Sequence, residues 1–158
     1  MALLDGKVCV VTGGAGSIGL ASAQRMLEEG GKVMLVDLDP AALDAAVQTL
    51  NSPHVFAFAC DVTDAARVAA SFEAIVTRWG KIDVIFSNAG NAGRNARVED
   101  YPEDIFDTTL TIHAKGAFLA CKYGLPHMND GGSIIITSSI SGVRGGAGVN
   151  MAYVTAKH

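Results

Sequence analysis

Short apolar runs alternate with longer, helix-like stretches along the 158 residues of this chain. Five runs are apolar throughout or nearly so, at 7–11, 32–37, 54–60, 82–86 and 133–137. Strands that are apolar on both faces are typical of a parallel sheet covered by helices on both sides. The pattern therefore predicts about five parallel strands joined by helical crossovers.

The stretches between these runs carry helix start and stop signals. Gly30-Gly31 and Gly80 are placed where glycine ends a helix, and Asp39-Pro40 is an acidic cap followed by proline at the first turn. Another cap is expected at Thr63 or Asp64, and a turn at 129–132. The predicted helices cover 17–29, 41–50, 64–79, one long helix at 102–128, and 152–158.

This β-α alternation predicts an α/β fold, a Rossmann-type doubly wound parallel sheet with strand order 3-2-1-4-5. No internal repeat or linker interrupts the chain, so a single domain over residues 1–158 is expected. In such sheets, ligands bind beyond the carboxyl ends of the strands. Polar or glycine-rich segments follow several predicted strands, and we expect them to form the functional site.

Composition narrows the classes of function. The chain is 49% hydrophobic and 18% charged, as in a folded globular protein, and its net charge of −4 provides no basic surface for nucleic acid. No run approaches the roughly 18 apolar residues of a membrane span. The N-terminus does not resemble a secretory signal, so a cytoplasmic location is expected. Cys9, Cys60 and Cys121 are far apart and are interpreted as buried thiols, with no metal site.

A glycine-dense segment, 12–19, lies between the first strand and the first helix. Gly14, Gly16 and Gly19 fit the G-x-G-x-x-G spacing of dinucleotide-binding loops. Glycines let backbone N–H groups approach a phosphate, and the helix N-terminus adds a partial positive charge. The segment therefore indicates a nucleotide-phosphate site, and a plain tight turn is the alternative.

Two acids follow the second and third strands. Asp37 is placed to accept hydrogen bonds from both ribose hydroxyls of an adenosine and to repel a 2′-phosphate. No basic residue stands at Gly14, Ala15 or Leu38, so NAD is favoured over NADP. A solvated acid or a helix cap is the alternative for Asp37. Asp61 has two open interpretations: it binds the adenine amino group, with Val62 flanking the ring, or it only begins the next turn.

Three residues near the C-terminal end suggest chemistry. Tyr153 and Lys157 are four apart on a predicted helix and share one face, and Ser139 follows the fifth strand. A phenol ordinarily has a pKa of about 10, and a neighbouring ammonium favours the phenolate that a base requires. Taken alone, the tyrosine and the lysine are an ordinary surface pair. Their place in a nucleotide-binding domain favours a catalytic role.

Together these motifs resemble the short-chain dehydrogenase/reductase family. The resemblance rests on 12–19, Asp37, Asp61-Val62, Asn88-Ala89-Gly90, Ser138-Ser139 and the Tyr153 to Lys157 segment, in the family's order over nearly the whole chain. It implies reversible hydride transfer between NAD and a secondary alcohol or ketone. The implied cofactor contacts are Gly13, Gly16, Ser17, Ile18, Gly19, Asp37, Asp61, Val62, Asn88, Ala89, Gly90, Tyr153 and Lys157.

The resemblance also implies catalytic roles. Tyr153 is the implied acid/base, Ser139 binds the substrate oxygen, and Lys157 holds the nicotinamide ribose and favours the tyrosinate. Asn88 and Gly90 are expected to lie along the cofactor and to steady the central strand. A homodimer or homotetramer is implied as well.

Three departures from the family pattern qualify these expectations. The loop order Gly16-Ser17 differs from the usual one, and the Ser17 hydroxyl is expected to preserve phosphate binding. His113 stands where the family has a catalytic asparagine, so it either takes part in an altered proton relay or packs inside the helix. The chain also stops one residue after Lys157, well short of the family's length, which leaves the fifth strand as an expected bare edge.

The shortness of the chain leaves a second function class open. The chain is either part of a longer enzyme or an NAD-binding module or fragment without turnover. The loop at 91–100 is expected to line the substrate entrance. Arg94 and Arg97 in this loop either attract an anionic substrate or are simply solvated.

Overall fold

The computed structural model describes residues 2–144 and 150–158, so part of the expected 138–151 loop lies outside the described residues. Five parallel strands form one sheet in the order β3-β2-β1-β4-β5, which confirms the predicted fold class and strand order. The strands are β1 (Val8–Thr12), β2 (Lys32–Asp37), β3 (Val55–Ala59), β4 (Ile82–Ser87) and β5 (Met128–Ile136).

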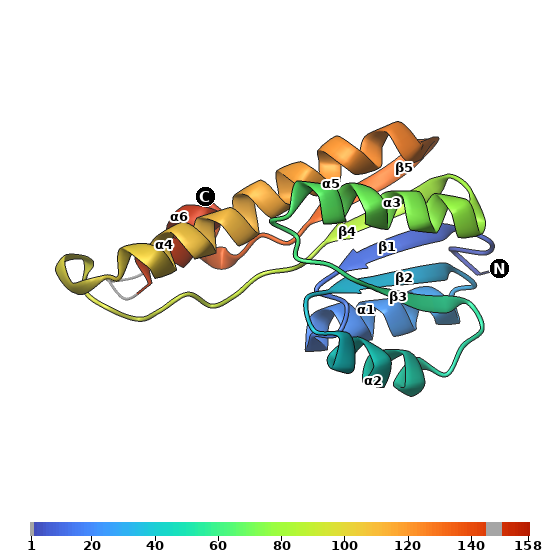
Figure 1. The fold of residues 1–158 in the computed structure, drawn as a ribbon, viewed down its shortest axis with the longest axis horizontal. Helices are drawn as coiled ribbons and strands as arrows, with labels where there is room; N and C mark the ends of the chain where they lie inside the picture. The colour runs from blue at the N-terminus through green and yellow to red at the C-terminus, as the bar shows by residue number, and fades with distance from the viewer. Residues whose placement is uncertain (1, 145–149) are drawn as a thin grey trace.

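Helices cover both faces of this sheet (Figure 1). Helices α1 (Ser17–Glu28) and α2 (Pro40–Leu50) lie on one face, and α3 (Ala65–Trp79) and α5 (Gly116–Gly124) lie on the other. Helices α4 (Glu103–Leu110) and α6 (Met151–Lys157) pack together beyond the carboxyl ends of the strands.

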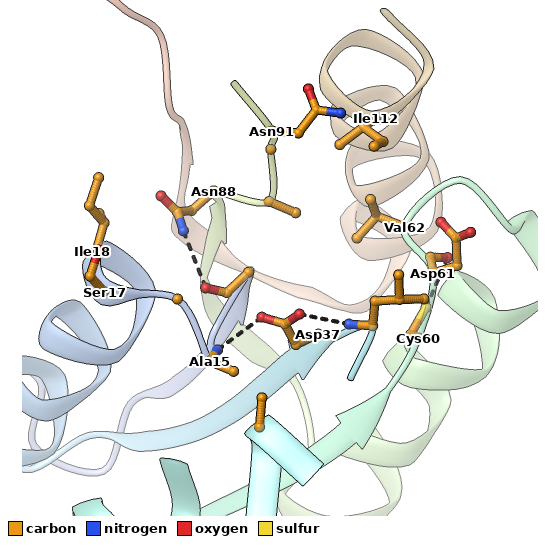
Figure 2. Close-up of a pocket in the computed structure, with 16 residues that line it drawn as sticks. Ala15, Ser17, Ile18, Asp37, Cys60, Asp61, Val62, Asn88, Asn91 and Ile112 are labelled. Carbon is orange, nitrogen blue, oxygen red and sulfur yellow. Dashed lines mark hydrogen bonds between the residues drawn. The ribbon is translucent and has the colours of Figure 1, made fainter. Parts of the chain in front are cut away.

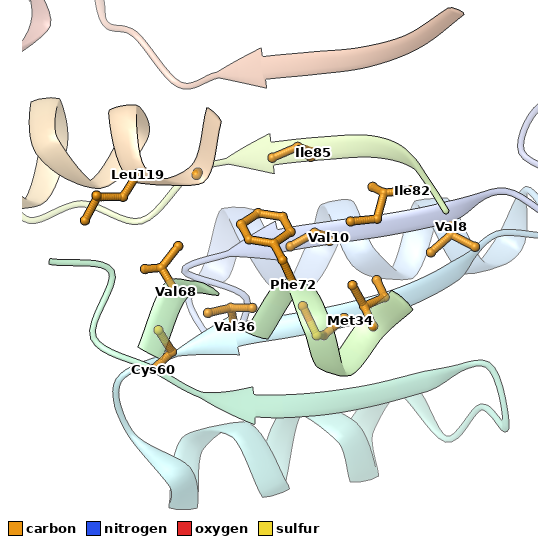
Figure 3. Close-up of a cluster of buried hydrophobic side chains, with 12 residues drawn as sticks. Val8, Val10, Met34, Val36, Cys60, Val68, Phe72, Ile82, Ile85 and Leu119 are labelled. Atoms are coloured by element: carbon orange, nitrogen blue, oxygen red, sulfur yellow. The ribbon is translucent and has the colours of Figure 1, made fainter. Parts of the chain in front are cut away.

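Strand β1 is apolar from Val8 to Val11 because alternate side chains enter two different cores. Val8 and Val10 of β1 join Phe72 of α3 in the cluster of Figure 3. Cys9 and Val11 of the same strand face α1 and α2 in a second cluster. Both faces of β1 are therefore removed from water, which explains why its apolar pattern does not alternate.

Local signals place the helix ends as predicted. The Asp39 carboxylate accepts a hydrogen bond from the Ala41 N–H at 2.9 Å at the start of α2, and Asp64 caps α3 in the same way. Gly80 ends α3 with φ of +84°, a left-handed conformation that favours glycine.

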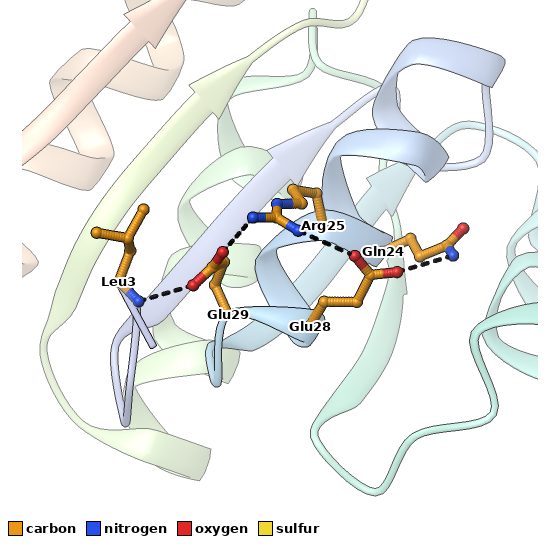
Figure 4. Close-up of polar contacts among 5 residues, drawn as sticks. All are labelled: Leu3, Gln24, Arg25, Glu28 and Glu29. Carbon is orange, nitrogen blue, oxygen red and sulfur yellow. Dashed lines mark hydrogen bonds and ion pairs between the residues drawn. The ribbon is translucent and has the colours of Figure 1, made fainter. Parts of the chain in front are cut away.

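The N-terminal segment is attached to the end of α1 (Figure 4). The Leu3 N–H donates to Glu29 Oε2 at 2.8 Å, and Arg25 forms ion pairs with Glu28 and Glu29. These contacts join the first residues of the chain to the helix that follows the glycine-rich loop.

The long helix predicted at 102–128 is helical along most of its length but is not a uniform α-helix. A π-helical segment, Thr111–Lys115, separates α4 from α5, and a 3-10 turn at Leu125–His127 precedes β5. A π segment is a single widened turn and is frequent at functional sites. It contains His113, which the sequence analysis marked as unusual.

The predicted turn at 129–132 is wrong in one respect, because these residues are an irregularity inside β5. Met128 already pairs with Ile82, and regular pairing resumes at Ser133 with Val84. The extra residues bulge from the ladder, so β5 begins five residues earlier than the predicted start at Ser133. As expected, β5 is an edge strand within the described sheet, and Ile135 and Ile136 are about half exposed.

A buried carboxylate that the sequence analysis did not single out joins β1, β4 and β5. Asp83 accepts hydrogen bonds from the Val8 N–H at 2.9 Å, from Lys7 Nζ at 3.0 Å and from Asn129 Nδ2 at 3.0 Å. Burial alone would raise the pKa of Asp83, but these three donors outweigh it and hold the pKa below its usual range.

Two of the cysteines are buried thiols, as interpreted from the sequence. Burial raises the pKa of Cys9 to about 12 and that of Cys60 to about 11, so both thiols stay protonated at neutral pH. Cys121 is also a free thiol and is partly exposed. Across 2–144 and 150–158, none of the helices has the length and apolar character needed to cross a membrane.

Candidate functional site

A cleft of about 590 Å³ opens at the carboxyl ends of β1 to β4, beside the start of α1 (Figure 2). We call it the first cleft. Its lining includes most of the residues predicted to contact a cofactor. They are Gly13, Gly16, Ser17, Ile18, Asp37, Asp61, Val62, Asn88, Ala89 and Gly90, and they are joined by Ala15, Leu38, Ala42, Cys60, Asn91 and Ile112.

The glycine-rich loop requires glycine for reasons of space. Gly13 has φ of +66°, and a Cβ there would stand 2.9 Å from the Ala89 Cα. At Gly19, a Cβ would stand only 2.1 Å from the Gly13 carbonyl oxygen. Gly19 therefore lies directly against the Gly13 backbone and is not among the residues that line the first cleft, and its cofactor contact stays a prediction.

The start of α1 is arranged for an anion. Gly16 is the N-cap of α1 and has no side chain that could accept hydrogen bonds from the first-turn N–H groups. Ser17 and Ile18, in that first turn, both line the first cleft. The helix N-terminus is therefore open and faces a cavity. This geometry favours the interpretation as a phosphate site over that of a plain tight turn.

Asp37 is held by backbone donors at the end of β2. Its Oδ2 accepts from the Ala15 N–H at 3.0 Å and its Oδ1 from the Leu38 N–H at 2.8 Å (Figure 2). The cap of α2 is Asp39, so the helix-cap alternative for Asp37 is wrong. Its carboxylate is instead fixed against the glycine loop, at the wall of the first cleft.

Asp61 begins a turn and also lines the first cleft, and its contact with adenine stays a prediction. One oxygen, Oδ1, accepts from the N–H and the hydroxyl of Thr63, both at 2.8 Å, so the residue does begin a turn. Asp61 and Val62 also line the first cleft. Val62 reaches this place because Gly116 of α5 has no side chain, and a Cβ there would stand 3.1 Å from Val62 Cγ2.

Asn88 connects the ends of three strands. Its backbone N–H donates to Thr12 Oγ1 at 2.9 Å, its Nδ2 donates to the Thr12 carbonyl at 3.2 Å, and its Oδ1 accepts from the Thr137 hydroxyl at 3.2 Å. The expected steadying of the central strand is thus visible as bonds to both neighbouring strands. The same residue lines the first cleft.

A second cleft of about 370 Å³ adjoins the first. The two share Ile18, Asn88, Gly90 and Asn91. Tyr153, Lys157 and His113 line the second cleft and belong to two segments far apart in sequence. Ala92, also in the second cleft, belongs to the loop at 91–100 that was expected to line the substrate entrance, whereas Thr137 and Asn150 were not predicted.

Tyr153 and Lys157 form more than a surface pair. Lys157 Nζ donates to the Thr137 carbonyl at 2.7 Å and lies 5.6 Å from the centroid of the Tyr153 ring. Burial lowers the pKa of Lys157, because the ammonium is partly removed from water. The lysine therefore bridges the end of β5 and the tyrosine.

His113 is 8% exposed and meets Tyr153 directly. The two rings are T-shaped with centroids 5.5 Å apart, and His113 Nε2 lies 2.9 Å from the Asn91 carbonyl oxygen. The ring packs so closely on Gly90 that a Cβ there would stand 2.3 Å from His113 Cε1.

The second ring nitrogen of His113 has a different environment. Within the part of the chain that the structure describes, Nδ1 is buried with no hydrogen-bond partner. Burial lowers the pKa of His113, and the Lys157 ammonium lowers it further, against the opposing effect of the bond to Asn91. The folded state therefore favours the neutral ring, and its Nε2 faces both the Asn91 N–H at 3.2 Å and the Asn91 carbonyl oxygen at 2.9 Å.

Ser139 lines neither of the two clefts. Its Oγ accepts a hydrogen bond from the Ser141 N–H at 3.2 Å and caps the 3-10 turn Ile140–Gly142. The hydroxyl proton is not used by this bond. In the entrance loop, Arg97 pairs with Glu99 at 2.6 Å and its side chain is 79% exposed, which fits a solvated arginine.

Several lining residues had a signal that sequence reasoning overlooked. Cys60 and Thr137 stand at the ends of predicted strands, and Ile112 is adjacent to His113. Asn91 directly follows the Asn88 to Gly90 motif. Asn150 had no local signal, because only the tertiary structure brings it to the second cleft.

Known proteins match both the sequence and the fold. The family described as Enoyl-(Acyl carrier protein) reductase matches residues 13–158. The uncharacterized oxidoreductase YxbG of Bacillus subtilis (strain 168) is 37% identical over 145 residues, covering 90% of this chain and 53% of that protein. The levodione reductase of Leifsonia aquatica is 35% identical over 158 residues, covering 96% of this chain and 59% of the relative.

Among solved structures, an NAD+-bound xylitol dehydrogenase superposes with a TM-score of 0.92 at 40% identity, covering 98% of this chain and 61% of that one. The strand order and the likeness to this solved structure define a Rossmann-type fold. The chain belongs to the short-chain dehydrogenase/reductase family. It spans 53–61% of the length of these three relatives.

Proposed function

We propose that this chain forms the cofactor-binding and catalytic part of an NAD-dependent enzyme that transfers a hydride between NAD(H) and a secondary alcohol or ketone. The observation that carries the proposal is the adjoining of the two clefts. One has an open helix N-terminus and a fixed carboxylate, and the other contains Tyr153, Lys157 and His113. A dinucleotide in the first cleft would present its far end to these side chains.

The residues of the first cleft suit a dinucleotide. The loop at 13–19 has no room for side chains at Gly13, Gly14 and Gly19, and it leaves N–H groups for the pyrophosphate. Asp37 would accept the ribose hydroxyls, and its charge, with uncharged Ala15, Leu38 and Ala42 around it, supports NAD over NADP. The xylitol dehydrogenase relative holds NAD+ in its structure, which supports the same choice.

When bound, NAD supplies the group that accepts or donates the hydride. The chain's own part is proton transfer and orientation. In alcohol oxidation, Tyr153 Oη accepts the proton of the substrate hydroxyl as a phenolate. Lys157, whose Nζ lies 5.6 Å from the centroid of the Tyr153 ring, would stabilise that negative charge and contact the nicotinamide ribose. The hydroxyl proton of Ser139 is not used in capping, but this side chain lies outside both clefts and would have to turn toward the second cleft to donate to the substrate oxygen.

His113 takes the place of the family's asparagine in this scheme. His113 Nδ1 is buried beside Tyr153 without a hydrogen-bond partner among the described residues, which supports an altered relay over simple packing. A buried nitrogen without a partner is costly in a group that only packs. The relay role is tested through its pH dependence, as described in the Discussion.

The substrate class is proposed from the second cleft and one relative. One relative is named for xylitol, a polyalcohol, which supports an alcohol with several hydroxyl groups as the substrate. The cleft offers uncharged polar groups for such a substrate in Asn91, Asn150 and Thr137. A small polyol or hydroxyketone is therefore the first class to assay.

The test measures turnover by this chain with NAD+ and a panel of polyols, and the absorbance of the NADH that forms reports the rate. We expect Tyr153→Phe to abolish turnover while NADH still binds, as measured by fluorescence titration. Tyr123→Phe is the matched control, because it removes a tyrosine hydroxyl outside both clefts.

The second candidate function is an NAD-binding module without turnover. It is favoured by the first cleft, whose lining residues all lie between 13 and 112 and include none from α6. NADH binding without turnover across the panel would support the module and contradict the enzyme.

A further inference from the structure

The side chain of Asn150 connects the start of α6 to a distant loop. Its Oδ1 accepts from the Tyr153 N–H at 3.3 Å and from the Tyr101 hydroxyl at 3.3 Å. Its Nδ2 donates to the Ala92 carbonyl. We call Asn150, Tyr101 and Ala92 the clasp. It joins residues more than 45 positions apart, since Tyr101 and Asn150 are 49 positions apart and Ala92 and Asn150 are 58.

The loop side of the clasp is closely fitted. The Arg94 N–H donates to Tyr101 Oη at 3.1 Å, so the tyrosine is held from both directions. Gly93 has φ of +61°, and a Cβ there would stand 2.8 Å from Asn150 Oδ1 and 3.1 Å from Tyr101 Oη. Because no side chain fits between them, the loop backbone lies directly against the two polar groups.

The clasp borders the second cleft. Ala92 and Asn150 line the cleft together with Tyr153 and Lys157. Helix α6 packs against α4, and Asn150 adds hydrogen bonds to the loop at the start of this helix.

We propose that Asn150 is a positioning residue that, through Tyr101 and Ala92, places Tyr153 against the loop wall of the second cleft. The proposal rests on the proposed role of Tyr153 as acid/base. An ordinary N-cap needs only the bond from Oδ1 to the Tyr153 N–H. The two bonds to the loop exceed what capping requires, and they hold the tyrosine in register with the wall that a substrate touches.

Two variants separate positioning from capping. Asn150→Ser keeps a good helix cap but is too short to hold both loop partners. Tyr101→Phe leaves the cap untouched and keeps the ring, which packs on Phe106 with centroids 6.5 Å apart, but removes the hydroxyl. We expect each variant to lower kcat by about tenfold to a hundredfold, as a displacement of about 1 Å would.

Further readouts distinguish this role from a general loss of structure. The affinity for NADH should be unchanged in both variants, because no clasp residue lines the first cleft. The double variant should be no slower than the slower single variant, since both changes break the same connection. Parental kcat in Asn150→Ser, or fully multiplicative effects in the double variant, would overturn the proposal.

Hydrogen exchange tests the clasp without relying on turnover. Tyr101→Phe should speed amide exchange at Tyr153 and along α6, and Tyr123→Phe should not. If the parent binds NADH but has no turnover, the proposed function fails while this measurement still decides the clasp. Unchanged exchange in Tyr101→Phe would contradict the clasp whatever the activity.

Discussion

Replacing Asp83 by asparagine should weaken the fold where β1, β4 and β5 meet. The carboxylate is 11% exposed and accepts three hydrogen bonds, from the Val8 N–H, Lys7 Nζ and Asn129 Nδ2. Asparagine has nearly the same shape but only one acceptor oxygen. At least one donor is therefore left facing an NH₂ group, and the ion pair with Lys7 is lost.

The size of the effect follows from these contacts. A hydrogen bond to a charged group contributes about 1.5–3 kcal/mol, and a buried donor left without a partner costs a similar amount. We expect Asp83→Asn to lower the free energy of unfolding by about 2–4 kcal/mol. With a urea m-value of about 2 kcal/mol/M, the unfolding midpoint should fall by about 1–2 M.

The effect should also depend on pH. The folded state lowers the pKa of Asp83, so its contribution to stability is complete above the carboxyl's unfolded pKa of about 4 and is lost as pH falls through the lower folded value. The difference in the free energy of unfolding between the parent and Asp83→Asn should therefore become smaller as the pH falls below about 4.

Urea unfolding of the parent, Asp83→Asn and the control Asp44→Asn checks this reasoning. Asp44 is an exposed acid on α2, so its replacement makes the same chemical change without buried contacts. The reasoning would be refuted if Asp83→Asn had the same unfolding midpoint as the parent. It would also be refuted if Asp44→Asn lowered the midpoint as much as Asp83→Asn does.

Other predictions concern the two clefts. Gly19→Ala should lower the melting temperature sharply because its Cβ meets the Gly13 carbonyl at 2.1 Å, whereas Gly16→Ala, whose nearest contact is 3.4 Å, should melt near the parent. Asp37→Ser should bring the fluorescence-measured affinities for NADPH and NADH closer together, and an unchanged ratio would contradict the ribose contact. Because the pKa of His113 is lowered on folding, protonation favours the unfolded chain and stability falls as pH drops below about 6.5. His113→Asn should reduce this dependence, and an unchanged pH–rate profile would exclude a relay.

Much of the architecture could be read from the sequence because its signals are local. Apolar runs predicted the five strands, and Asp39, Asp64 and Gly80 marked helix ends as observed. The glycine spacing at 13–19 indicated a loop whose backbone must approach other atoms, and the structure gives those atoms. The cofactor contacts and catalytic roles assigned from the resemblance stay predictions.

Other features depended on contacts between distant segments. The bulge in β5 is set by pairing with β4, and Asp83 is buried because three strands converge on it. Ser139 stands in the expected loop, yet its side chain caps a 3-10 turn outside both clefts. Neither a strand pattern nor a family motif carries the direction in which a side chain points.

The sequence by itself determined the order of strands and helices, the glycine loop, and the spacing that puts Tyr153 and Lys157 on one face. Only the tertiary structure decided that Lys157 bonds to Thr137, that the His113 ring meets Tyr153, and that Asn150 joins α6 to the 91–101 loop. The physical reason is the distance along the chain over which each kind of interaction acts. Hydrophobic periodicity and capping act within a few residues, whereas hydrogen bonds and ring contacts across the clefts exist only after the sheet has brought their segments together.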